Sequence, residues 1–162
     1  MRRLLASIFV LGLLSVGVGA QEAIYLIRHG EKELSGEDPS LTSEGHQRAA
    51  DWAKMLRDVG LDSIITSDAR RTRQTGETIA AALGLSTKTL PRDDVAGLVD
   101  VLEFDHEDDN VLVVAHTETI PRILRSLGVT DEIAIDQGDF ANLFVLLRPA
   151  STEPVFLHFR MP

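Results

Sequence analysis

The chain has no cysteine among its 162 residues, so neither a disulfide bond nor lipid attachment at a cysteine is available to it. Aromatic residues make up only 5% of the sequence, which predicts a core formed mainly by aliphatic side chains. There is no excess of basic charge either: the formal net charge is −9, which argues against a nucleic-acid partner. Because no internal repeat, low-complexity segment or linker interrupts the sequence, we expect one folded domain.

The first twenty residues differ in character from the rest of the chain. A short basic start is followed by an apolar run from Leu4 to Val18, and small residues lead up to Ala20. This pattern predicts a signal peptide at residues 1–20, and hence a secreted or periplasmic domain at residues 21–162 that has no stable association with a membrane. An uncleaved membrane anchor is the alternative, for which an apolar run of about 17 residues is at the lower limit.

The remaining sequence alternates between two hydrophobic patterns. Short apolar runs are typical of buried strands, and apolar residues spaced three or four positions apart are typical of helices. Strands are expected at about residues 23–28, 61–66, 86–90, 111–115, 143–147 and 155–159, and helices at about 43–59, 69–83, 95–102 and 121–127. This alternation predicts an α/β three-layer sandwich with a mostly parallel central sheet.

Capping residues support these helix positions. Thr42 precedes the first helix as its expected N-cap, and Gly60 is expected to end that helix. For the second helix, Ser67 or Asp68 could provide the N-cap, and Gly84 is expected to stop it.

Three of the predicted strands end in groups that can bind an anion. The first strand runs into Arg28 and His29, the second ends at Ser67 just before an arginine cluster, and the apolar strand at residues 111–115 ends at His116. Ligands of parallel α/β sheets bind outside the carboxyl ends of the strands. We therefore expect these side chains to meet at one edge of the sheet.

The arginine cluster places Arg70, Arg71 and Arg73 in the first turn of a helix, where the helix dipole disfavours cations. The cluster is either a solvated helix start or an anion site made of guanidinium groups and free backbone N–H groups. Helical phase directs Arg70 to solvent and leaves both Arg71 and Arg73 able to reach over the sheet edge. Two histidines and two arginines suit a dianionic phosphate, and a histidine can serve as its nucleophilic acceptor.

These segments resemble the motifs of the histidine phosphatase superfamily, whose fold is phosphoglycerate-mutase-like. Residues 28–31, Arg-His-Gly-Glu, are similar to its Arg-His-Gly signature, and residues 67–75 are similar to its Ser-x-x-x-Arg-Ala-x-Gln-Thr segment. Residues 113–116 resemble the strand that delivers a second histidine, and residues 41–45 fit a Leu-Thr-x-x-Gly helix start. Only 116 − 71 = 45 positions separate the second and third motifs, so the chain resembles small members without a helical lid, including the phosphohistidine phosphatases.

The resemblance implies a catalytic set of Arg28, His29, Arg71 and His116. His29 would attack phosphorus and become a phosphohistidine, while the other three would hold the phosphoryl group. No cofactor and no metal ion are implied. The expected activity is that of a phosphoric monoester hydrolase acting on a small phosphorylated substrate; a phosphohistidine or other phosphoprotein substrate and non-catalytic binding of a phosphorylated ligand are the alternatives.

The resemblance leaves the proton donor to the leaving group open. Where the family commonly has Gly after the second histidine, this chain has Thr117, and many members take the donor from an inserted region that is absent here. Candidates are Glu118, Asp94 and Glu103, although Asp94 or the adjacent Asp93 is also expected to cap the third helix.

A metal site is a separate alternative. His29 and Glu31, and again His116 and Glu118, repeat one spacing at two strand ends, and these four side chains could ligate a divalent ion. The neighbouring arginines argue against it, because they would repel a cation.

Overall fold

The computed structural model describes residues 23–148 and 153–162, so the predicted signal peptide at residues 1–20 lies outside the described residues. The elements follow in the order β1 (Ala23–Arg28), α1 (Ser43–Met55), β2 (Ser63–Ser67), α2 (Arg70–Leu83), β3 (Thr87–Leu90), α3 (Val95–Phe104), β4 (Asn110–Ala115), α4 (Ile120–Ser126), β5 (Asn142–Leu147) and β6 (Val155–Arg160). Strands and helices thus occur close to the positions expected from the hydrophobic pattern.

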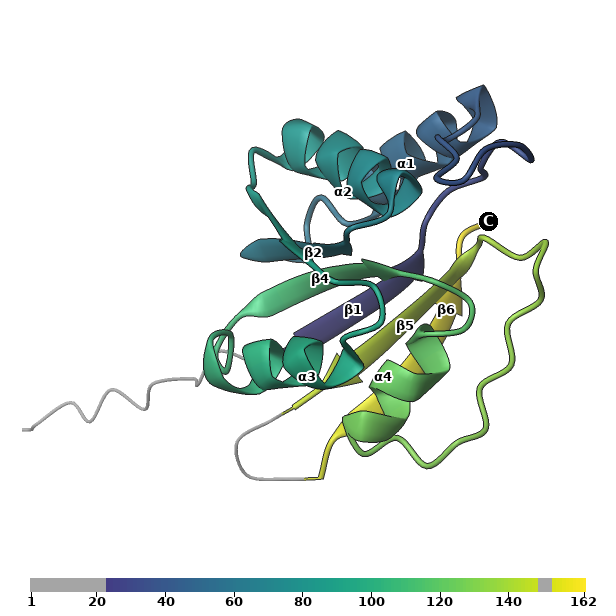
Figure 1. Ribbon diagram of the computed structural model, residues 1–162. Helices are drawn as coiled ribbons and strands as arrows, with labels where there is room; N and C mark the ends of the chain where they lie inside the picture. Colours follow the sequence, from purple (N-terminus) through teal and green to yellow (C-terminus); the bar gives the residue numbers. More distant parts are fainter. Residues whose placement is uncertain (1–22, 149–152) are drawn as a thin grey trace, which may run out of the picture.

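The strands form one six-stranded sheet with the order β3-β2-β4-β1-β5-β6. The first four of these strands pair in parallel. At one side of the sheet, β5 pairs antiparallel with both β1 and β6. Figure 1 shows α1 and α2 on one face of the sheet and α3 and α4 on the other. The predicted three-layer α/β sandwich with a mostly parallel sheet is confirmed.

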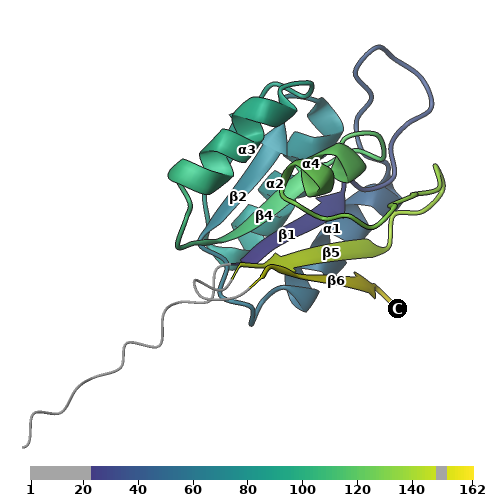
Figure 2. The ribbon, with the colours of Figure 1, turned by 90° about the horizontal axis from the view of Figure 1, so that it is seen from below.

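Each face of the sheet carries its own aliphatic core. One core packs Ile64, Leu112 and Val114 against α1 and α2, and the other packs Leu26, Val111 and Val113 against α3 and α4. Figure 2, which views the molecule from below, shows α3 and α4 lying over the sheet. Strand β4 is buried on both faces, and this explains why its sequence is apolar throughout. Each buried side chain of this size contributes roughly 1.5–3 kcal/mol.

Two helix ends differ from the prediction. Helix α1 begins at the predicted N-cap, since the side chain of Thr42 accepts a hydrogen bond from the N–H of Gly45, but it ends at Met55 rather than near Gly60. After Met55 the chain tightens into turns, with the N–H of Arg57 directed to the carbonyl of Lys54, so the apolar spacing continues for several residues beyond the helix.

The start of α2 was predicted wrongly. Ala69 is the N-cap, and it makes no side-chain capping bond. Instead, the carboxylate of Asp38, from the loop after β1, accepts the backbone N–H of Arg70 at 2.9 Å. Ser67 and Asp68 are engaged elsewhere, because Ser67 contacts His116 and Asp68 accepts the N–H of Arg92.

Backbone segments also meet closely where β1 leaves the sheet. A Cβ atom added to Gly45, in the first turn of α1, would lie 2.2 Å from the carbonyl oxygen of Glu31. One added to Gly30 would lie 2.5 Å from the carbonyl oxygen of Gly45. Glycine at both positions lets α1 pack directly on the segment that carries His29.

Within residues 23–148 and 153–162, no helix combines the length and apolar character required to cross a membrane.

Candidate functional site

The three anion-binding strand ends lie side by side in the sheet. Arg28 of β1 is in register with Ala115 of β4, and the N–H of His29 bonds to the carbonyl of Ala115 at 3.1 Å. His116 therefore follows directly beside His29, and their ring centroids are 5.3 Å apart in an edge-on arrangement. On the other side of β4, strand β2 ends at Ser67. The expected convergence at one sheet edge is confirmed.

The imidazole of His29 is held in one tautomer. Its Nδ1 lies 2.7 Å from the carbonyl oxygen of Gly30, and because a carbonyl only accepts, Nδ1 carries the proton. The other nitrogen, Nε2, accepts a hydrogen bond from Nε of Arg71 at 3.1 Å, so its lone pair points toward the guanidinium group. Burial, with the nearby charges of Arg71, Arg28 and Lys32, lowers the pKa of His29 to about 4 despite the bond to Gly30. His29 is thus neutral at neutral pH.

His116 is arranged in the opposite sense. Its Nδ1 faces Nη2 of Arg71 at 3.2 Å, and since a guanidinium only donates, Nδ1 is an acceptor in this contact. Its Nε2 carries the proton and donates it to Oγ of Ser67 at 2.8 Å. Burial, together with the positive charges around it, lowers the pKa of His116 to about 2. The role of Ser67 as a partner of the second histidine was not predicted.

Arg71 joins the two histidines, whereas its neighbours in the cluster do not. Its side chain is buried, that of Arg70 is exposed as predicted, and that of Arg73 is half-buried. Asp38, which caps α2, also lies 3.8 Å from Nη1 of Arg71. Asp38 was missed because it stands in a polar loop whose sequence does not indicate where it folds back.

Arg28 is fixed by the segment between α4 and β5. Its Nη1 donates to the backbone carbonyls of Asp136, Gln137 and Asp139, at 3.2, 2.7 and 3.2 Å. Its guanidinium carbon lies 4.0 Å from the ring centroid of Phe140, a cation–π contact. The Nε atom of Arg28 is buried and has no hydrogen-bond partner among the described residues, so its N–H is left without an acceptor there.

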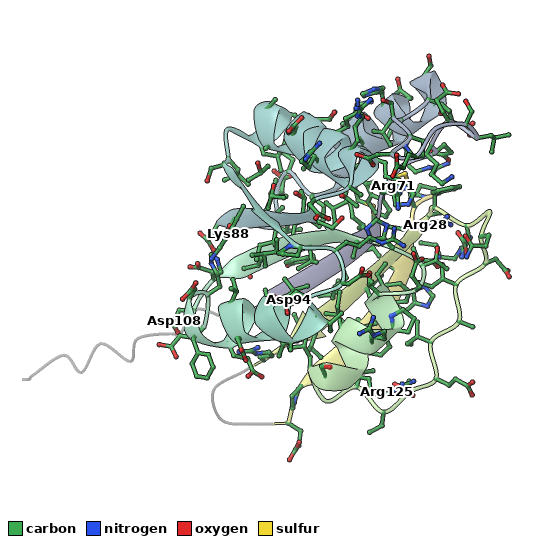
Figure 3. All side chains as sticks on the ribbon, in the orientation of Figure 1. Arg28, Arg71, Lys88, Asp94, Asp108 and Arg125 are labelled. Carbon is green, nitrogen blue, oxygen red and sulfur yellow. The ribbon has the colours of Figure 1, made fainter. Side chains whose placement is uncertain are left out.

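Figure 3 shows Arg28 and Arg71 close together at this end of the sheet, while Asp94 lies apart from them. The sequence model of the histidine phosphatase superfamily (branch 1) matches residues 24–94, the part of the chain that runs from β1 through α1, β2 and α2 to β3. Over these 71 of its 162 residues the chain is similar to members of the histidine phosphatase superfamily. The segment from residue 72 to residue 115, described throughout, holds only the rest of α2, β3, α3 and β4, so no helical lid is inserted there.

Curated relatives match only a part of this chain and a part of their own length. A protein of Erwinia tasmaniensis named probable phosphoglycerate mutase GpmB is 41% identical over 76 residues, which are 43% of this chain and 35% of that protein. The chain thus spans about a third of the length of the curated relatives it matches.

Two solved structures share the fold. The protein histidine phosphatase SixA in complex with tungstate superimposes with a TM-score of 0.68 at 21% identity, covering 85% of this chain and 96% of that chain. A mycobacterial glucosyl-3-phosphoglycerate phosphatase superimposes with a TM-score of 0.63 at 16% identity, covering 78% and 90%.

Specific hydrogen bonds hold the segment at residues 67–75, which resembles a superfamily motif. Oγ1 of Thr75 accepts the N–H of Gly30 at 3.1 Å and donates to the carbonyl of Arg71 at 2.8 Å. Oε1 of Gln74 accepts the N–H of Leu41 at 2.8 Å. These bonds attach α2 to both ends of the loop that follows β1, and they set Arg71 against His29.

The three candidate proton donors lie in different places. Asp94 caps α3 as predicted, its Oδ1 accepting the N–H of Gly97 at 2.9 Å. Glu103 is exposed on α3. Glu118 is paired with Arg92, from the loop between β3 and α3, and its charge acts on both Arg28 and Arg71.

The carboxylates of the metal-site alternative are bound by arginines. Oε1 of Glu31 accepts from Nε of Arg48 at 2.6 Å, and Glu118 pairs with Arg92. Over residues 23–148 and 153–162, no group of three or more potential ligands is arranged to hold a metal ion.

Proposed function

We propose that the protein is a phosphatase that hydrolyses phosphate monoesters through a phosphohistidine at Nε2 of His29. The observation that carries this proposal is the arrangement of His29: its Nδ1–H is directed to Gly30, and its unprotonated Nε2 faces the buried guanidinium of Arg71. A neutral imidazole next to cationic donors is suited to attack a phosphoryl group whose charge those donors stabilise.

In the first step, Nε2 of His29 forms a bond to phosphorus and the bond from phosphorus to the leaving-group oxygen breaks. Arg71 exchanges its contact with His29 for a phosphoryl oxygen, the unpaired Nε of Arg28 binds a second one, and His116 keeps its contacts with Ser67 and Arg71. Charge-assisted bonds from guanidinium groups to such oxygens are strong and well oriented. In the second step, water attacks phosphorus, the nitrogen–phosphorus bond breaks, and inorganic phosphate leaves.

A small phosphate monoester is the proposed substrate class. Support comes from the predicted signal peptide, since a secreted or periplasmic location separates the protein from cytoplasmic phosphohistidine. A phosphohistidine or other phosphoprotein is the second candidate, favoured by the absence of an inserted lid between residues 72 and 115 and by the shared fold with SixA, a protein histidine phosphatase.

Trapping the intermediate tests this function. The protein is incubated with p-nitrophenyl phosphate and quenched in alkali, and an acid-labile phosphoryl group is expected on His29 by mass spectrometry. The His29→Ala variant is expected to lose this group and at least about 1000-fold in kcat/KM, because it removes the nucleophile. His46→Ala, on the exposed face of α1, serves as the control and should retain both properties.

Undiminished hydrolysis by His29→Ala would contradict the enzymatic mechanism. Binding of inorganic phosphate without turnover of any ester by the unmodified protein would instead favour the non-catalytic binder.

A further inference from the structure

An ion pair stands at the mouth of the site. Nη2 of Arg92 donates to Oε1 of Glu118, and the side chains are 39% and 53% exposed, so the pair is partly open to solvent. The N–H of Arg92 is tied to Oδ1 of Asp68 at 3.1 Å, which attaches its loop to the exit of β2. Glu118 lies in a turn after β4 that is closed by the N–H of Thr119 on the carbonyl of His116, at 3.1 Å. Both partners are therefore held at the carboxyl ends of the site strands.

The pair lies near the groups proposed to bind the phosphoryl group. Arg92 lines the same cavity as Ser67 and His116, and its positive charge acts on both Arg71 and His116. Among the charges that act on Arg28, that of Glu118 has the largest effect, and it reaches Arg71 as well. A phosphate ester held by Arg28 and Arg71 would thus have Glu118 on its solvent side, from which the leaving group departs.

We propose that Glu118 donates the proton to the leaving-group oxygen and that Arg92 positions the Glu118 carboxyl group for this transfer. The inference rests on the proposed phosphatase function and deepens it. The other candidates are less suited, since Asp94 is occupied in capping α3 and Glu103 is exposed on that helix.

The protonation of Glu118 changes with the charge in the site. Partial burial raises its pKa, but the bond to its own backbone N–H and the charges of Arg92 and Arg71 outweigh burial, so the net pKa lies below the usual value. A bound phosphate dianion neutralises the arginines and repels the negative charge of the Glu118 carboxylate. Burial is then no longer outweighed, and the pKa of Glu118 rises. Glu118 therefore takes up a proton as the substrate binds.

The proton balance over the two steps is complete. As phosphorus is transferred to His29, the Glu118 carboxyl gives its proton to the leaving oxygen, and an alcohol departs. When water attacks the phosphohistidine, the Glu118 carboxylate accepts a proton from that water. The residue returns to its starting state together with His29.

Leaving groups of different basicity test the proposal. The nitrophenolate of p-nitrophenyl phosphate departs without a proton, whereas the alkoxide of glycerol phosphate does not. We expect Glu118→Gln to lower kcat/KM for glycerol phosphate by about 100-fold or more and to change that for p-nitrophenyl phosphate by less than about fivefold. Glu77→Gln, exposed on α2, is the matched control and should leave both rates unchanged.

The results separate this inference from the proposed function. Equal losses on both substrates, no loss on either, or a selective loss in Glu103→Gln in place of Glu118→Gln would overturn the role of Glu118. If the unmodified protein forms no phosphohistidine and hydrolyses neither ester, the proposed function itself fails. Rapid turnover of p-nitrophenyl phosphate in the same preparation shows that Glu118→Gln is folded.

Arg92 is tested by its effect on the pH profile. In Arg92→Met the loss of a nearby cation raises the pKa of Glu118 in the free protein, so the alkaline decline of kcat/KM for glycerol phosphate is expected at higher pH. Arg92→Lys retains the charge and should keep the decline near its original position. An unchanged profile in Arg92→Met would overturn the positioning role, since a purely structural role would alter the rate and not the pH of the decline.

Discussion

At the scale of single residues, the chemistry of the site depends on which ring nitrogen carries a proton. His29 and His116 are both buried and neutral, but their contacts impose opposite tautomers. A backbone carbonyl takes the proton of Nδ1 in His29, while the hydroxyl of Ser67 takes that of Nε2 in His116. Both imidazoles therefore direct a lone pair to Arg71, His29 through Nε2 and His116 through Nδ1. The same side chain thus adopts a different tautomer in each of two surroundings.

Arg71 and Arg73 give a direct comparison at this scale. Arg71→Gln removes a buried guanidinium that contacts both histidines, so kcat/KM for p-nitrophenyl phosphate should fall by about 100- to 1000-fold, the range seen when one transition-state donor is removed. Arg73→Gln, two positions along the same helix and half-buried, should retain the rate within about threefold. Comparable losses in both variants would show that the anion site includes Arg73.

At the scale of elements, the position of His29 depends on how α1 and α2 pack on the exit of β1. Helix α1 approaches through Gly45, with backbone against backbone. Helix α2 is attached through Thr75, whose hydroxyl bonds to the N–H of Gly30. The segment that carries His29 is thus held by both helices on one face of the sheet, and a change in either helix should reach the site.

Gly45→Ala tests this packing. The added methyl group would clash with the backbone of Glu31, whose carbonyl oxygen would lie 2.2 Å away, so we expect the free energy of unfolding to fall by about 1–3 kcal/mol. Hydrolysis should fall as well, because Glu31 lies two residues after His29. Gly138→Ala is the control: its Cβ would have no heavy atom within 4 Å and its φ is not positive, so urea unfolding should be nearly unchanged. Equal stability of the two variants would contradict the close approach.

At the scale of the whole molecule, His29 and His116 are neutral in the folded protein, and this makes its free energy of unfolding depend on pH. Burial lowers the pKa of His29 to about 4 and that of His116 to about 2. In the unfolded chain both would titrate near pH 6.5. As the pH falls from about 6.5 toward 4, the unfolded chain takes up protons at these positions and the folded protein does not, so stability is complete above this range and is lost within it.

The pH dependence of unfolding measures this linkage. For one such histidine the slope approaches about 1.4 kcal/mol per pH unit, which amounts to about 2 kcal/mol between pH 7 and pH 5. Urea unfolding at these two pH values measures the free energy of unfolding. Between pH 7 and pH 5, His29→Gln should lose about 2 kcal/mol less of it than the unmodified protein does. His46→Gln, on the exposed face of α1, should show the same loss as the unmodified protein, and an equal loss in His29→Gln would mean that His29 is not buried in its neutral form.

The layers of this protein, and the edge of the sheet at which its site lies, follow from the pattern of amino acids alone. The apolar run of β4 requires burial on both faces, and polar residues that follow such strands must emerge together at their carboxyl ends. Helix phase excluded Arg70, and caps such as Thr42 and Gly84 depend on local backbone geometry that a few adjacent residues decide.

How the site residues are held depends on contacts that form only in the folded protein. Arg28 is bound by the carbonyl of Asp139, 111 positions away, and backbone carbonyls leave no mark in the sequence because every residue has one. The tautomer of His29 likewise depends on a carbonyl, and the pairing of Arg92 with Glu118 depends on two loops meeting after the sheet has formed. Residue type and spacing specify local geometry, whereas contacts between distant segments require the assembled fold.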